Sequence, residues 1–252
     1  MSARPRVGLF VTCLVDLVRP QVGFASVKLL EAAGCDVAVP ATQTCCGQPA
    51  WNAGADRDAK EIARNVIAAF EGFDYVVAPS GSCAGMIKRH YPEVFEKDAA
   101  SLPRARALAA KTHELLSFLV KVRGMTGVAA SYAGKVCYHD SCSSLREMGV
   151  KAEPRALLAS VAGTSVTELA DPQVCCGFGG LFSVKYPEIS ERMADDKIAD
   201  VRNTGADTLL GGDLGCLLHL AGRMQRQGKP LKVRHVAEVL ADMGGEKALG
   251  EP

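Results

Sequence analysis

Eight of the ten cysteines in this 252-residue chain fall into two matching sets of four. A Cys-Cys-Gly triplet that begins at Cys45 occurs again at Cys175, 130 residues later. One cysteine precedes the triplet by 32 residues in the first set and by 33 in the second, and another follows the second paired cysteine by 37 and 40 residues. The sets are Cys13, Cys45, Cys46 and Cys83, and Cys142, Cys175, Cys176 and Cys216. This repeat predicts two similar halves.

The segments between the cysteines repeat in the same order. Short apolar segments before the cysteines are predicted to be strands: 7–11, 36–39 and 75–78 in the first half, and 135–138, 165–169 and 208–210 in the second. Proline at the start and glycine at the end mark a helix after the first strand of each half, from Pro20 to Gly34 and from Pro154 to Gly163. Further helices are predicted over 59–70, 115–120, 189–201 and 236–240.

Strands that alternate with helices favour βαβ crossovers and a parallel sheet. The sequence therefore predicts an α/β protein with two tandem homologous lobes, each a small parallel sheet with flanking helices. The first would occupy residues 1–125 and the second residues 126–252, with the join near Lys121–Gly134. Ligands of such sheets bind beyond the carboxyl ends of the strands, and all eight repeated cysteines follow predicted strands. We expect one site in each lobe.

The overall charge restricts the partners of this protein. It has 29 lysines and arginines against 28 aspartates and glutamates, a formal net charge of +1, whereas nucleic acids and anionic lipids bind basic surfaces. No segment approaches the roughly 20 apolar residues of a membrane span, and Asp16 interrupts the apolar N-terminal stretch, which also lacks a signal-peptide cleavage site. We expect a cytoplasmic protein with no nucleic-acid binding and no membrane insertion, in which thiols stay reduced.

Four thiolates can hold an iron–sulfur cluster or a structural zinc ion. Zinc sites usually bring their ligands as close Cys-x2-Cys pairs, which this chain lacks, whereas ligands spread over a long segment suit a larger cofactor. Adjacent cysteines in extended backbone point in opposite directions, so the loop must bend sharply to direct both inward. Gly47 and Gly177 can adopt the positive φ that this bend needs. The alternative is that one thiol of each pair packs while the other is functional.

The pattern Cys…Cys-Cys-Gly…x-x-Cys, present twice, resembles the cysteine-rich CCG domain family, which contains iron–sulfur subunits of heterodisulfide reductase, glycolate oxidase and lactate-utilisation systems. The second half carries the clearest motifs: Tyr-His-Asp-Ser-Cys at 138–142, Cys-Cys-Gly-Phe-Gly-Gly at 175–180 and Asp-Leu-Gly-Cys at 213–216. The resemblance runs from Val7 to about Met243. A chain with two such domains and no fused ferredoxin module is most similar to the lactate-utilisation members.

This resemblance implies an iron–sulfur electron-transfer subunit of a complex that oxidises L-lactate to pyruvate, with up to one 4Fe-4S cluster per lobe on the two cysteine sets. Its partners would be other lactate-utilisation subunits, including a ferredoxin-type iron–sulfur protein. We expect no catalysis by this chain alone, because oxidation of a 2-hydroxy acid needs an acceptor such as flavin or nicotinamide beside a base. The glycines at 177–180 lack the Gly-x-Gly-x-x-Gly spacing of a dinucleotide site.

One departure from the family pattern concerns Ser80 and Asp213. In heterodisulfide reductase the last motif is Cys-x-x-Cys, and these two residues stand at its first position here. Four thiolates per lobe remain, which suits a cubane cluster rather than a non-cubane one. We expect both residues to be solvated loop residues, with an oxygen ligand as the alternative.

Three other functions stay open. The first is a heterodisulfide-reductase-like thiol–disulfide oxidoreductase acting at the Cys-Cys pairs. The second is a glycolate oxidase iron–sulfur subunit, and the third is a zinc-stabilised scaffold with no redox function.

Five further residues have less specific interpretations. Cys35 and Cys137 have no counterparts in the other half and are predicted to pack in the core, as free cysteines often do. His139 could hydrogen-bond near the second cluster and tune its potential, or it could be a loop histidine bonded to the backbone. His113 and His235 recur before predicted helices, and we interpret them as structural residues of helix N-termini.

Overall fold

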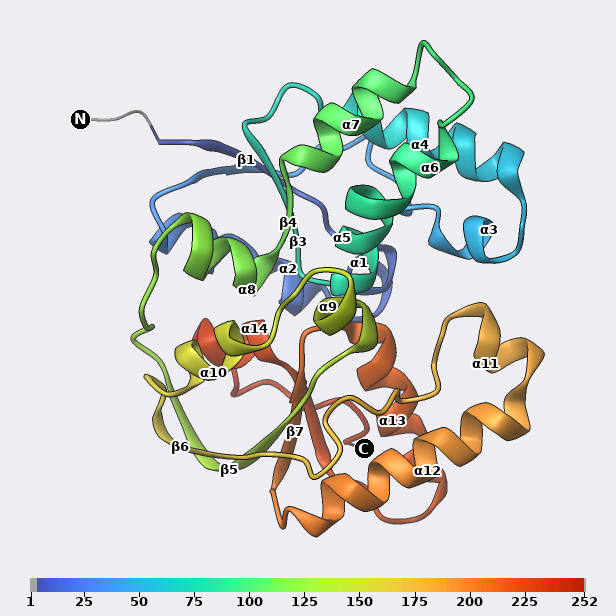
Figure 1. Ribbon diagram of the computed structural model, residues 1–252. Helices are drawn as coiled ribbons and strands as arrows, with labels where there is room; N and C mark the ends of the chain where they lie inside the picture. Colours follow the sequence, from blue (N-terminus) through green and yellow to red (C-terminus); the bar gives the residue numbers. More distant parts are fainter. Residues whose placement is uncertain (1–3, 252) are drawn as a thin grey trace. The chain divides into compact units, whose positions relative to one another are not determined.

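The computed structural model describes residues 4–251 and is coloured along the sequence in Figure 1. The chain divides into two compact units, Met1–Gly124 and Met125–Pro252, which we call the first and second lobes. Within the described residues, each lobe contains one four-stranded parallel sheet with flanking helices. The predicted fold class, two tandem α/β lobes that each carry a small parallel sheet, is confirmed.

The two sheets have the same strand order. It is β2-β1-β3-β4 in the first lobe and β6-β5-β7-β8 in the second, and every neighbouring pair is parallel. The strands are β1 (Arg6–Leu9), β2 (Asp36–Ala38), β3 (Tyr75–Ala78), β4 (Thr112–Glu114), β5 (Ser131–His139), β6 (Ala162–Thr167), β7 (Thr208–Gly211) and β8 (Lys232–His235). The inner strands β1, β3 and β7 are mostly buried apolar residues, as is typical of parallel sheets.

Helices supply the crossovers that parallel strands require. In the first lobe they are α1 (Cys13–Val18), α2 (Pro20–Ala32), α3 (Gln48–Asn52), α4 (Asp56–Phe70), α5 (Gly81–Gly85), α6 (Tyr91–Val94), α7 (Leu102–Ala110) and α8 (Leu115–Ser117), with the π-helical turns η1 (Met86–His90) and η2 (Phe118–Val122). In the second they are α9 (Cys142–Arg146), α10 (Ala152–Leu158), α11 (Leu181–Lys185), α12 (Pro187–Asn203), α13 (Leu214–Arg226) and α14 (Val236–Leu240). No helix within residues 4–251 combines the length and the apolar composition needed to cross a lipid bilayer.

Helices α4 and α12 occupy equivalent places in the two lobes. Each buries five residues at helical spacing, and every buried residue of α12 lies 131 positions after its counterpart in α4. The buried residues are Ala59, Ala63, Val66, Ile67 and Phe70 in α4, and Ser190, Ala194, Lys197, Ile198 and Val201 in α12. The apolar stripe predicted over 59–70 is therefore confirmed, while α12 buries two polar side chains within the same stripe.

Some boundaries differ from the sequence-based expectation. Strands β4 and β8 form where the sequence predicts only a segment before a helix. Three or four mostly polar residues give no periodic pattern, and these segments become strands by pairing with β3 and β7. Strand β6 begins at Ala162, so Gly163 lies inside it rather than at a helix end. Helix α10 already ends at Leu158, close to where the Ser160 hydroxyl donates to the Leu157 carbonyl over 2.7 Å.

Candidate metal-binding sites

The first cysteine set gathers at the carboxyl end of the first sheet. Cys13 begins α1 after β1, Cys83 is the third residue of α5 after β3, and the paired cysteines lie in the loop after β2. Two sulfur pairs meet there: Cys13 Sγ lies 3.9 Å from Cys45 Sγ, and Cys46 Sγ lies 3.4 Å from Cys83 Sγ. Both thiols of the Cys45–Cys46 pair thus face other members of the set.

The second set occupies the same positions in its own lobe. Cys142 begins α9 after β5, Cys216 is the third residue of α13 after β7, and the paired cysteines lie in the loop after β6. The thiol of Cys175 interacts with that of Cys142, and the thiol of Cys176 with that of Cys216. Each lobe therefore presents four thiols from three segments at one sheet edge.

In each lobe two of these thiols lie in the first turn of a helix. Side chains cap three of the four helices: the Thr12 hydroxyl accepts from Val15 N, the Ser80 hydroxyl from Cys83 N, and the Ser141 hydroxyl from Ser144 N. The free N–H groups and the positive end of the helix dipole at such positions favour a thiolate. The backbone itself therefore prepares both sets to bind a cation.

The Cys-Cys-Gly turns require glycine for two reasons. Gly47 and Gly177 have φ of +82° and +86°, which confirms the predicted positive φ. A Cβ atom at position 47 would lie 3.2 Å from Ile62 Cγ2, and one at position 177 would lie 2.5 Å from the backbone oxygen of Ser190. The turns bury the second cysteine of each pair and leave the first half-buried.

Electrostatic coupling among the thiols resists full deprotonation without a cation. Hydrogen bonds from Cys13 and then Cys46 lower the pKa of the Cys45 thiol to about 2. The hydrogen bond with Cys45, and then burial, raise the pKa of Cys13. The hydrogen bonds of Cys46 with Cys45 and Cys83 raise the pKa of Cys46. In the second set, the contact with Cys175 and then burial raise the pKa of Cys142. A bound cation removes this restraint, so metal binding would release protons.

A pocket of about 360 Å³ adjoins the first set. Cys13 and Cys45 line it, together with apolar residues and the polar side chains of Asp16, Gln43 and Thr44. A single water occupies about 30 Å³ of liquid, so the space beside these two sulfur atoms admits a group much larger than one ion.

Ser80 and Asp213 are not solvated, which corrects the sequence-based expectation. Ser80 is 4% exposed and Asp213 is 6% exposed, because both are N-cap residues at the carboxyl end of a central strand. The Asp213 carboxylate adds to the raised pKa of Cys142, after the hydrogen bond with Cys175 and burial. The second set therefore has a buried carboxylate beside it where the first has a hydroxyl.

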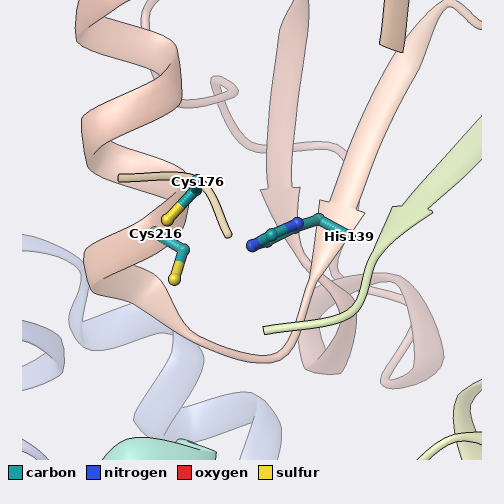
Figure 2. A group of neighbouring side chains, drawn as sticks. All are labelled: His139, Cys176 and Cys216. Atoms are coloured by element: carbon teal, nitrogen blue, oxygen red, sulfur yellow. The ribbon is translucent and has the colours of Figure 1, made fainter. Parts of the chain in front are cut away.

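His139 lies at the end of β5, where sequence reasoning left its role open. Its side chain points toward Cys176 and Cys216, as Figure 2 shows, and one donor atom from each of the three residues lies within 4.8 Å of the others. Among residues 4–251, neither ring nitrogen has a hydrogen-bond partner, so the interpretation as a backbone-bonded loop histidine is wrong. Burial, and then the charge of Lys197, lower the pKa of His139 to about 4.

The two helix-start histidines have different positions. His235 is the N-cap of α14, where its Nδ1 accepts from Ala237 N and Glu238 accepts from its backbone N–H, as expected. His113 instead lies within β4, and Glu114 caps α8 by accepting from Ser117 N over 2.9 Å. His113 and His235 match by residue type but are not structurally equivalent. The register of the two sheets makes Glu114 the equivalent of His235.

The two unmatched cysteines lie away from the loops of the sets. Cys35 is fully buried at the amino end of β2, and Cys137 is fully buried within β5 with its Sγ 3.9 Å from the Thr208 carbonyl oxygen. Burial raises the pKa of both thiols. Both positions agree with packing roles.

The chemistry of the donor sets fits metal or iron–sulfur binding. Each lobe brings thiols together at helix N-termini, where like-charge coupling leaves them short of a positive partner, and the second lobe adds an imidazole with no other partner among the described residues. Soft thiolate ligands select zinc and iron–sulfur clusters over hard cations.

The arrangement of two such lobes matches a known family. The model of the CCG cysteine-rich domain matches residues 7–88 and again residues 136–221. The chain belongs to this family.

Relatives that match along nearly the whole chain give a more specific comparison than the family does. The chain is 50% identical over 235 residues to the lactate utilization protein A of Geobacillus sp. (strain WCH70), covering 93% of this chain and 98% of that protein. It is 49% identical over 238 residues to the protein of the same name from Exiguobacterium sp. (strain ATCC BAA-1283 / AT1b), covering 94% and 97%. Among solved structures, a hypothetical protein from Helicobacter pylori shares the fold, with a TM-score of 0.64 and 11% sequence identity. The match covers 98% of this chain and 52% of that protein.

Proposed function

We propose that this protein is an iron–sulfur electron-transfer subunit in lactate utilisation, with one 4Fe-4S cluster held by each cysteine set. The observation that carries the proposal is the convergence of four thiols from three segments at the carboxyl end of each sheet. The names of the relatives, which are about 50% identical over nearly their whole length, support a role in lactate utilisation. They favour lactate over glycolate as the upstream substrate.

The residues of the chain would divide the work of holding a cluster. The helix N-termini at Cys13, Cys83, Cys142 and Cys216 favour thiolates, and the positive-φ glycines direct the paired cysteines toward the other members of each set. In the first lobe the Tyr91 hydroxyl donates to the Cys46 carbonyl oxygen over 3.0 Å and fixes this turn. A bound cluster supplies one-electron exchange, with a potential set by burial and by hydrogen bonds to sulfur.

Lactate oxidation itself would need partners. A cluster accepts one electron at a time, whereas a 2-hydroxy acid gives up two electrons, so a flavin or nicotinamide acceptor must lie elsewhere. We propose that other lactate-utilisation subunits, one of them a ferredoxin-type iron–sulfur protein, form a cytoplasmic complex with this chain. Co-expression with those subunits, followed by pull-down and a lactate–dye reduction assay, tests this. Steady lactate oxidation by the purified chain without flavin would contradict it.

A zinc-holding scaffold is the second candidate, and one observation favours it. Tetrahedral zinc with Zn–S bonds of about 2.3 Å places its sulfur ligands about 3.8 Å apart, and the two sulfur pairs of the first set are 3.4 and 3.9 Å apart. The volume of the adjoining pocket, about 360 Å³, and the spread of the ligands over three segments favour the larger cofactor.

Metal and sulfide analysis of anaerobically purified protein separates the candidates. The iron–sulfur proposal expects iron and acid-labile sulfide in about equal amounts, with visible absorption that dithionite bleaches. Zinc at one per lobe without iron or sulfide would refute it and favour the scaffold. Metal-free protein whose Cys-Cys pairs cycle with a disulfide substrate would instead favour a thiol–disulfide oxidoreductase.

A further inference from the structure

The surroundings of the two cysteine sets differ at one position directly beside them. Phe10 follows β1 and precedes Cys13 by three residues, while His139 ends β5 and precedes Cys142 by three. Both side chains are buried. Phe10 packs against Phe70 with ring centroids 5.5 Å apart, so packing at this position needs only an apolar ring. The imidazole of His139 therefore needs an explanation other than filling space.

The two ring nitrogens of His139 provide that explanation. The side chain is 1% exposed, and neither nitrogen has a hydrogen-bond partner among residues 4–251. A buried polar group without a partner is destabilising, and native proteins rarely keep one. The ring points at the sulfur atoms of Cys176 and Cys216 (Figure 2), and the three donor atoms lie within 4.8 Å of one another.

The two charged residues near His139 are engaged elsewhere. The Asp140 carboxylate pairs with Lys151 and Arg155 at 2.6 Å each. The Lys197 side chain is fully buried, and its ammonium donates to the Asp171 carbonyl oxygen over 2.6 Å. An ammonium has no lone pair to offer an N–H group. The thiolates of the second set are therefore the acceptors that the ring faces.

We infer that His139 is a positioning residue for the metal centre of the second lobe, and that its N–H donates a hydrogen bond to the thiolate of Cys176 or Cys216. This inference rests on the proposed binding of a metal centre by the second set. Ligation by the ring is not required, because the first lobe presents the same four thiols with Phe10 in the equivalent place. An N–H group directed at a cluster ligand stabilises the reduced, more negative state and raises the potential.

The test isolates the second centre and then changes the ring. In a chain whose first set is disabled by Cys45→Ser and Cys46→Ser, the metal content and midpoint potential report the second set alone. Replacement His139→Phe should keep the iron content. It should lower the equilibrium constant for reduction of the second centre about tenfold, which makes the midpoint potential more negative by ~59 mV for one electron. His139→Gln keeps an N–H donor and should recover part of this shift. His139→Leu provides a smaller apolar side chain should Phe not fit.

His113, a half-buried histidine of the first lobe that contacts Tyr75 and Phe118, provides the control. His113→Phe should leave the potential of the second centre unchanged. An unchanged potential in both apolar variants at His139 would overturn the inference, as would loss of the iron itself, since loss would make the ring a ligand.

A second readout does not depend on the kind of metal. In metal-free protein His139→Leu removes unpaired polar atoms and should raise or preserve the unfolding temperature, whereas in metal-loaded protein it should lower it. Equal effects in the two states would overturn the inference. If the wild-type chain binds zinc but no iron, the proposed function is refuted and the inference about His139 is not. The unfolding temperatures of metal-free and zinc-loaded protein then still test the role of His139.

Discussion

The two lobes share their sheet topology and their thiols but differ in the residues around them. Val66 of α4 is matched by the fully buried Lys197 of α12, and Ala59 by Ser190. Val11 before Cys13 is matched by Asp140 before Cys142. At these positions the first lobe has apolar residues and the second has polar ones. The shared thiols are the groups that would hold a metal, and the differing residues are those that would tune its surroundings.

Most of the polar groups specific to the second lobe have partners within it. Ser190 donates to the Gly177 carbonyl oxygen over 2.8 Å. Asp140, whose side chain is 1% exposed, pairs with Lys151 Nζ and Arg155 Nη1 at 2.6 Å each. These contacts are structural, whereas the Asp213 carboxylate and the His139 ring lie beside the thiols.

The largest expected effect concerns the independence of the two sites. Because each ligand set lies within one lobe, Cys45→Ser and Cys175→Ser should each lower the iron content by about half, and the double variant should nearly abolish it. Cys35→Ser serves as the control and should change the iron content little. A single variant that empties both lobes, while circular dichroism shows an intact fold, would rule out independent sites.

The Asp140 ion pairs give the second lobe a stabilising contact that the first lobe lacks. Asp140→Ala should destabilise the metal-free second lobe by about 2 kcal/mol, because Lys151 and Arg155 lose their buried partner while Arg155 keeps Glu168. Val11→Ala, at the equivalent position, should cost about 1 kcal/mol or less. Trp51, the single tryptophan, lies in the first lobe, so its fluorescence follows that lobe while circular dichroism follows both during urea unfolding. An equal shift of the Trp51 transition would show that the lobes unfold together.

The two Cys-Cys-Gly turns should differ in their tolerance of alanine. Left-handed backbone alone costs an alanine about 1–2 kcal/mol, and this applies to Gly47→Ala and Gly177→Ala alike. The Cβ at position 177 also meets a backbone oxygen at 2.5 Å, whereas that at 47 meets the Cγ2 methyl group of Ile62 at 3.2 Å, a smaller overlap. Gly177→Ala should therefore lose more stability and more metal. If both variants lose the same free energy of unfolding and the same metal content, the left-handed backbone alone determines the cost of alanine in these turns.

The smallest effect is the pH dependence that His113 adds to the stability of the first lobe. Burial, and then the charge of Lys88, lower the pKa of His113 to about 4, so protonation favours the unfolded state, where the pKa is about 6.5. The stabilisation is complete above pH 6.5 and falls as the pH drops toward 4. His113→Phe should reduce this loss by about 1 kcal/mol at pH 5, as followed by Trp51 fluorescence. An unchanged pH profile in the variant would contradict the assignment.

Sequence reasoning reaches the fold and the cysteine sets because both depend on patterns along the chain. The alternation of strands and helices and the repeated spacing of Cys13, Cys45 and Cys83 are visible without coordinates. Burial of polar residues is not. Lys197 belongs by type to a solvated face, and its burial is compensated by the Asp171 carbonyl oxygen at 2.6 Å and by the Asp200 carboxylate at 4.0 Å.

Short strands are also missed by sequence reasoning, because they depend on neighbouring strands rather than on a pattern along the chain. In β4 three residues become a strand through their neighbours in β3, and the histidines that match by type occupy different positions in the two sheets. The sequence also predicts Asp213 and Ser80 to be loop residues, whereas the structure places each at the N-cap position of a helix.

The hydrogen bond from Tyr91 to the Cys46 carbonyl has a consequence for how the first site acquires its metal. Tyr91 begins α6, eight residues after Cys83, so one short segment fixes both a ligand and the turn that carries two others. The loop is therefore ordered by the protein before any metal arrives, and the conformational entropy of ordering it is lost during folding rather than during loading. Preorganisation of this kind strengthens binding without adding a contact to the metal. Tyr91→Phe should thus slow reconstitution and weaken metal retention while leaving all four thiols in place.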